Sequence, residues 1–133
     1  TLVHQPRRNE VRRFMLEVVR PALAEVAEEL REHGIDAHLA EEESPITRTW
    51  VEVRHGDEID FFYSVHVTAY EPPSFVMRDT RRQRQDRLRY FRAEVHLREG
   101  GQDYDIMGWS HKDIIGDVLD QYERHMHFLD AVR

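Results

Sequence analysis

The chain has 133 residues, of which 40% are hydrophobic and 34% are charged, a length and composition typical of one globular domain. It contains no cysteine, which excludes disulfides and thiolate metal sites, and no apolar run is long enough to cross a bilayer. The net charge of -7 argues against general nucleic-acid binding. We therefore predict a single domain over residues 1–133 that binds no nucleic acid. Since it begins with Thr1 rather than Met, we expect it to be a piece of a longer protein.

The first predicted element is an amphipathic helix over residues 8–32. Its apolar residues recur at spacings of three and four: Val11, Phe14, Met15, Val18, Val19, Ala22, Leu23, Val26, Ala27 and Leu30. His33 and Gly34 predict its end. Pro21 lacks a backbone donor and crowds the preceding turn, so we expect a kink there or two abutting helices with Pro21 in the first turn of the second.

The middle of the chain alternates with a period of two, which predicts strands. Residues 35–39, 49–54, 61–70 and 91–98 each place apolar side chains on one face, and a fifth strand is expected over 104–107. Residues 55–58 predict a tight turn, and Gly100 and Gly101 predict another. Pro72 and Pro73 are expected to end the third strand, because proline cannot donate a hydrogen bond to a sheet.

A final helix is expected after Ser110, which with Asp113 forms an N-terminal capping pattern. Its apolar face is formed by Ile114, Ile115, Val118, Leu119, Tyr122, Met126 and Leu129. Short turns between most strands favour an antiparallel sheet. The fold class is therefore α+β, a two-layer sandwich in which an N-terminal helix and a C-terminal helix both pack on one face of about five strands.

Basic residues are concentrated in residues 78–92, which contain seven Arg and two Asp. Such a stretch gains about 1 kcal/mol per basic residue beside an anionic lipid surface, and salt weakens that gain. The alternative is a solvated loop. The candidate contacts with lipid or an acidic partner are Arg78, Arg81, Arg82, Arg84, Arg87 and Arg89.

The histidines and aspartates do not form a recognisable active site. His38, His66 and His96 are expected on the outward face of the sheet with Glu52 and Glu94, but their spacing matches no metal-binding motif. Asp103 and Asp105 are expected to meet nearby Arg, and His125 and His127 to serve as helix-end or packing residues. We predict no catalytic residue, no cofactor and no metal, and so no enzyme.

Three aromatic residues, Trp50, Phe62 and Tyr70, are expected on the same outward face. Exposed aromatic side chains of this size are typical of an interface. They favour self-association or docking over binding of a small ligand, and a homo-oligomer is left open.

Several longer strings of the sequence resemble one family. Residues 91–109 and 117–129 read FRAEVHLREGGQDYDIMGW and DVLDQYERHMHFL, and residues 19–23, 25–30 and 73–75 read VRPAL, EVAEEL and PSF. These strings are similar to the cytoplasmic tail of choline transporters of the BetT type, which belong to the betaine–choline–carnitine transporter family. The resemblance covers essentially the whole chain.

The resemblance implies a cytoplasmic regulatory domain of an osmoregulated choline importer in the bacterial inner membrane, which supplies glycine-betaine synthesis. Its partners would be the membrane half of the same transporter and an anionic lipid surface. The membrane half would hold the choline and ion sites, so none of those residues is carried over. The alternative reading is a stand-alone ligand-binding, metal-binding or oligomerisation module with the same α+β fold.

Overall fold

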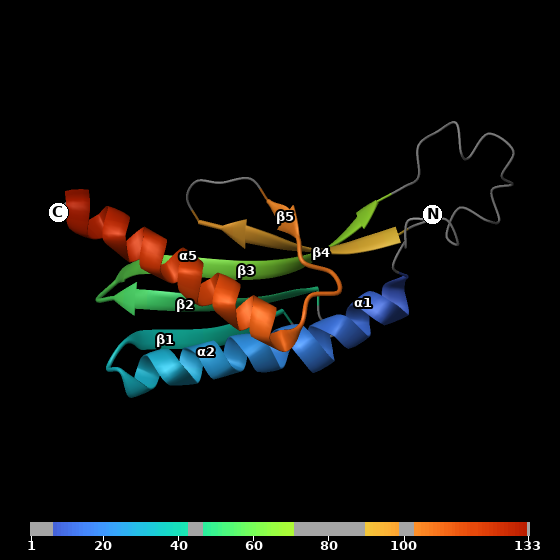
Figure 1. The fold of residues 1–133 in the computed structure, drawn as a ribbon, viewed down its shortest axis with the longest axis horizontal. Coiled ribbons are helices and arrows are strands. Elements are labelled where there is room, and N and C mark those ends of the chain that lie inside the picture. The colour runs from blue at the N-terminus through green and yellow to red at the C-terminus, as the bar shows by residue number, and fades with distance from the viewer. Residues whose placement is uncertain (1–6, 43–46, 71–89, 99–102, 133) are drawn as a thin grey trace, which may run out of the picture.

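The computed structural model describes residues 7–42, 47–70, 90–98 and 103–132 (Figure 1). An N-terminal helical segment is formed by α1 (Arg8–Phe14), the π-helical segment η1 (Met15–Val19) and α2 (Arg20–Glu32). Five strands follow, β1 (Asp36–Glu41), β2 (Arg48–His55), β3 (Glu58–Tyr70), β4 (Tyr90–Leu97) and β5 (Tyr104–Asp105), and then helix α5 (His111–Val132). The predicted arginine contacts, the Pro72–Pro73 strand end and the Gly100–Gly101 turn lie outside the described residues.

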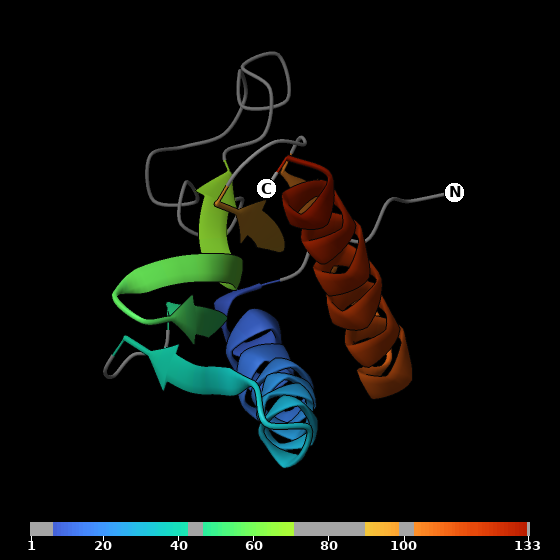
Figure 2. The ribbon, with the colours of Figure 1, turned by 90° about the vertical axis from the view of Figure 1, so that its left-hand side faces the viewer.

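The five strands form one antiparallel sheet in the order β1-β2-β3-β4-β5, so each strand pairs with its neighbour in the chain. In the side view, α2 and α5 lie on the same side of this sheet (Figure 2). The predicted α+β architecture, with both helices on one face, is confirmed.

The core lies between the helices and the inward face of the sheet. Most of the side chains that the alternation predicted to face inward are buried: Ala37, Val51, Val53, Phe61, Tyr63, Val65, Phe91, Ala93 and Val95. Leu39, Val67 and Leu97 are half-buried, and Ala69 is exposed. The helices contribute Val11, Met15, Val19, Leu23 and Val26 from one end of the chain and Ile114 and Val118 from the other. Each fully buried Val, Leu or Ile contributes about 1.5–3 kcal/mol.

Pro21 is accommodated by a change of helix type rather than by a simple kink. The amide of Arg20 donates to the carbonyl of Met15, five residues back, which is the π-helical pattern. Pro21 then occupies the first turn of α2, where an amide has no partner within its own helix. Of the two expectations for Pro21, the abutting helix is the closer one, although the segments continue without a break.

Local turns follow the sequence closely. Gly34 has φ +79° and the amide of Ile35 bonds the carbonyl of Leu30, which ends α2 as predicted. The β2–β3 hairpin turns at Gly56, whose φ is +63°. The amide of Asp113 donates to Oγ of Ser110 at 3.1 Å, which confirms the predicted helix cap.

The fifth strand is shorter than predicted, since it ends at Asp105 instead of Met107. Oδ1 of Asp105 accepts hydrogen bonds from the amide of Ala93 on β4, at 3.3 Å, and from the amide of Met107, at 3.0 Å. An aspartate that binds an amide two residues ahead forms a turn of its own. The alternation of residues in the sequence continues past Asp105, but the side chain of Asp105 ends the strand there, and the prediction was therefore too long.

Candidate functional site

The face of the sheet opposite the helices carries polar and aromatic side chains, and we call this surface the open face. Its members are Arg48, Trp50, Phe62, Ser64, His66, Tyr70, Tyr90, Arg92, Glu94 and His96. At one end, the guanidinium of Arg48 lies over the ring of Trp50, 4.4 Å from its centroid, and 5.4 Å from that of Phe62. Nε of Arg48 also donates to Oγ of Ser64 at 3.2 Å, and Ser64 is fully buried. The aromatic residues predicted to face outward do so, but they are half-buried under a cation instead of forming a bare apolar patch.

At the other end of the open face, Tyr70 and Tyr90 stack with ring centroids 5.6 Å apart, and the guanidinium of Arg92 lies 4.6 Å from the Tyr70 ring. The hydroxyl of Tyr70 donates to Oε2 of Glu94 at 2.5 Å. This hydrogen bond is the main cause that raises the pKa of Tyr70. Glu94 is only 9% exposed, so its carboxylate is held within the open face.

Two histidines meet between these ends. The rings of His66 on β3 and His96 on β4 lie 4.1 Å apart. Nδ1 of His96 lies 2.9 Å from a carboxylate oxygen of Asp103, and its Nε2 lies 4.0 Å from Glu94. Nε2 of His66 is buried and has no hydrogen-bond partner among the described residues. Burial lowers the pKa of His66, and the charges of His96 and Arg48 lower it further.

On the helix side of the sheet, one carboxylate joins three elements. Oδ2 of Asp117 on α5 accepts hydrogen bonds from the hydroxyl of Tyr63 on β3, at 2.7 Å, and from that of Tyr104 on β5, at 2.5 Å. Burial, followed by these hydrogen bonds, raises the pKa of both tyrosines, so both hydroxyls stay protonated donors.

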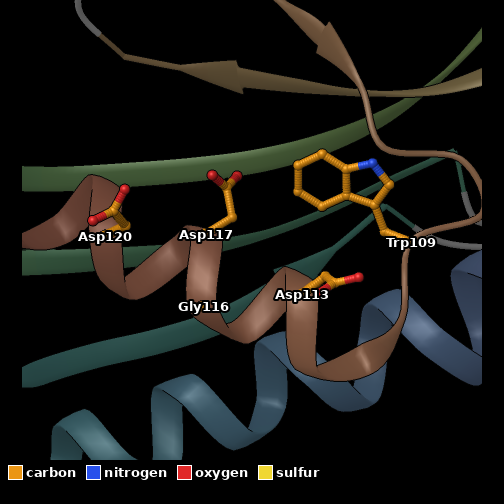
Figure 3. A pocket seen from close by; sticks show the side chains of 5 residues that line it. All are labelled: Trp109, Asp113, Gly116, Asp117 and Asp120. Carbon is orange, nitrogen blue, oxygen red and sulfur yellow. The ribbon is translucent and has the colours of Figure 1, made fainter.

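Asp117 also lines an open pocket of about 460 Å³ with Trp109, Asp113, Gly116 and Asp120. In Figure 3 the carboxylates of Asp117 and Asp120 point away from α5 on the side where the indole of Trp109 lies. Carboxylates and an indole that line one pocket suit a cation chemically. Among the described residues, the hydrogen bonds of Asp117 come from two tyrosines, so its carboxylate is not paired with a nucleophile there.

Of the candidate metal ligands, His66, His96 and Glu94 lie together, but His38 does not join them. His38 on β1 pairs with Asp36 at 2.5 Å, two strands away from His66 on β3. Within the described ranges, no group of three or more His, Asp or Glu side chains is arranged to hold a metal ion.

Two expectations about single residues were wrong. Asp103 meets His96 and Asp105 meets backbone amides, where we expected arginine partners. Helix α5 continues to Val132, so His125 lies before its last turn. It packs near Phe61, with ring centroids 6.1 Å apart, which confirms the packing role that was one of the two expected for it.

Sequence reasoning also missed two polar residues. Ser64 looked like an ordinary outward position, yet Arg48 and its neighbours bury it. Asp117 lies among helix residues with no motif of its own, and only the packing of α5 against β3 and β5 reveals its partners.

Comparison with known proteins gives three related transporters. The chain is 36% identical over 133 residues to a glycine betaine transporter of Acinetobacter baylyi. It is 32% identical to an osmo-dependent choline transporter of the same organism and 36% identical to a high-affinity choline transport protein of Escherichia coli, in both cases over 136 aligned residues. A search of family models found no match.

Each alignment covers 99% of this chain but only 19% of the first two relatives and 20% of the third. None of the helices in the described parts of the chain has the length and apolarity needed to cross a membrane. The resemblance noted in the sequence is thus confirmed: along nearly its whole length, the chain is related to one segment of the betaine–choline–carnitine transporter family.

Proposed function

We propose that this chain is the cytoplasmic regulatory domain of a high-affinity choline transporter, and that it adjusts transport to osmotic strength. The observation that carries the proposal is the alignment of 99% of the chain with about one fifth of transporters, one of which is named osmo-dependent. The segment has a core of its own, as a domain set apart from a membrane half would need. The named relatives are transporters, which fits the expectation that this chain is not an enzyme.

The proposed partners are the membrane half of the same transporter and the anionic lipid around it. The proposed contacts are those named from the sequence: Arg78, Arg81, Arg82, Arg84, Arg87 and Arg89. At about 1 kcal/mol for each basic residue, six arginines would supply about 6 kcal/mol at low salt. Moving a two-state equilibrium from 1:99 to 99:1 requires about 5.5 kcal/mol, so contacts of this strength suffice to hold a transporter in one state.

Osmotic stress concentrates the salt inside the cell, which shortens the distance over which charges act. The Debye length falls from about 10 Å at 0.1 M to about 3 Å at 1 M ionic strength. The arginine contacts would then weaken, the domain would leave the lipid or the acidic partner surface, and the equilibrium of the gate would shift. A homo-oligomer of the isolated domain is left open here, as it was from the sequence.

The test is charge reversal in the full transporter. Replacing Arg81, Arg82 and Arg84 together with Glu is expected to shift the osmolality at which choline uptake reaches half of its maximum. Replacing the same three residues with Lys keeps the charge and should leave the curve in place. Uptake is measured in cells over a series of osmolalities and normalised to the amount of transporter in the membrane. Identical activation curves for the Glu variant and the unmodified protein would refute the proposed contacts.

A further inference from the structure

The His66–His96 pair lies at the centre of the open face, where the charges around the two rings are unequal. Two carboxylates, of Asp103 and Glu94, lie within 4.0 Å of His96. No ion pair of His66 is found in the described part of the chain, although its ring lies 4.1 Å from that of His96. The carboxylates close to the pair therefore lie beside the His96 ring, and a proton on His66 would have no such partner next to it among the described residues.

The other charged groups that face His66 come from every strand around it. Across β2 its partner in the register is Arg48, and across β4 its partner is Glu94. Glu42, just after β1, lies 3.7 Å from Arg48, and so part of its charge is balanced there. Glu94 is likewise engaged by Tyr70, at 2.5 Å, and by Arg92, at 4.0 Å. The acidic groups near His66 are thus shared with other cations and donors, and Arg48 and His96 oppose a further positive charge.

We infer that the His66–His96 pair is a proton-sensitive element, which holds the open face in its present arrangement only while His66 is neutral. Adding a proton to His66 would place a charged imidazolium ring against the ring of His96, with the guanidinium of Arg48 on the adjacent strand. The rings would separate, and the side chains packed around them, among them Ser64 and Arg48, would lose their present contacts. Acid would thereby change the surface that this face presents.

The sign of the effect on stability follows from the same geometry. Burial and the neighbouring positive groups lower the pKa of His66 in the folded chain below its ordinary value of about 6.5. Between these two values the unfolded chain binds a proton that the folded chain does not bind. Stability contributed by neutral His66 is therefore present above about pH 6.5 and is lost as the pH falls below it.

The first measurement is an NMR titration of the histidine rings in the unmodified 133-residue chain. We expect the His66 ring to reach half-protonation below pH 6.5, with shifts of signals from Ser64 and Arg48 at the same pH. Half-protonation of His66 at or above pH 6.5, or a titration that leaves those neighbours unchanged, would overturn the inference. Because it uses the natural sequence, this measurement does not depend on whether any variant folds.

The second measurement compares urea unfolding midpoints at pH 7.5 and pH 5.0. The unmodified chain should unfold at a lower urea concentration at pH 5.0 than at pH 7.5. The midpoint of His66→Phe, which keeps an aromatic ring but binds no proton, should fall distinctly less between these two pH values. His38→Gln is the matched control, since His38 lies exposed on the same face of the sheet and should leave the loss unchanged. An equal loss in His66→Phe and the unmodified chain would overturn the inference. The inference about the His66–His96 pair concerns this domain alone and does not rest on the proposed osmotic role.

Discussion

Among single residues, Asp117 connects the most distant parts of the fold. One oxygen of its carboxylate accepts the hydroxyls of Tyr63 and Tyr104, which come from different strands, while the residue itself belongs to the last helix. Tyr63 is completely buried, so its hydroxyl has no access to water if that acceptor is lost. A buried donor without a partner costs about 1–3 kcal/mol.

We therefore predict that Asp117→Ala lowers the free energy of unfolding by about 1–3 kcal/mol, measured by urea denaturation at pH 7. Asp117→Asn keeps an acceptor oxygen and should cost less. Asp120→Ala is the control on the same helix, because Asp120 is exposed and pairs only with Arg124, at 3.1 Å, among the contacts described. Surface pairs of this kind contribute about 0–1 kcal/mol. Equal losses for the Asp117→Ala and Asp120→Ala variants would contradict the role assigned to Asp117.

The partner of Ser110 could be predicted from the sequence, and the partners of Asp117 could not. The Ser110 cap depends on an amide three residues later, so its pattern is visible in the sequence. The partners of Asp117 lie 54 and 13 residues away and depend on how α5 is rotated against the sheet. The same reason explains why Asp103 was assigned an arginine partner when its neighbour is His96.

At the scale of elements, two glycines in different backbone conformations should respond in opposite ways to replacement by alanine: one replacement lowers the stability of the domain and the other raises it. Gly56 turns the β2–β3 hairpin with φ +63°, a conformation that residues with a side chain rarely adopt. Gly116 lies inside helix α5, and a Cβ added there would meet nothing within 4 Å. Space around the residue is open in both cases, so backbone conformation alone decides the outcome.

We predict that Gly56→Ala destabilises the domain by about 1–2 kcal/mol, whereas Gly116→Ala stabilises it by about 0.5–1 kcal/mol. Both are read from urea unfolding curves, with circular dichroism confirming that the fold is retained. Gly56→Asn should cost less than Gly56→Ala, because asparagine tolerates positive φ better. A loss of stability in Gly116→Ala as large as that in Gly56→Ala would contradict this account.

The elements themselves could be predicted better than their irregularities. Alternation and short turns predicted about five strands, their antiparallel pairing and most of their inward faces. The order of the strands was not predicted, and the structure shows that neighbours in the chain pair with one another. The π-helical segment before Pro21 could not be predicted, since spacings of three and four residues fit a helix with or without one wider turn. The early end of β5 was missed because the side chain of Asp105 competes with the ladder.

At the scale of the whole molecule, the sheet divides the domain into a packed side and an open side. The helices and the core occupy one face, and the other carries the arginine, aromatic and histidine side chains of the open face, which ends in the Tyr70–Tyr90 stack. The chain accounts for about one fifth of the transporters that it matches. Its proposed role is therefore to act on a membrane half through a surface rather than to carry out transport itself.

The central claim is that this domain sets the osmotic response, and removing it from the full transporter tests that claim most directly. Choline uptake is measured against osmolality with and without residues 1–133, with membrane levels of both proteins matched. We predict that the shortened transporter still takes up choline but that its rate no longer follows osmolality as the intact protein's does. An unchanged osmotic activation curve in the shortened transporter would contradict the claim.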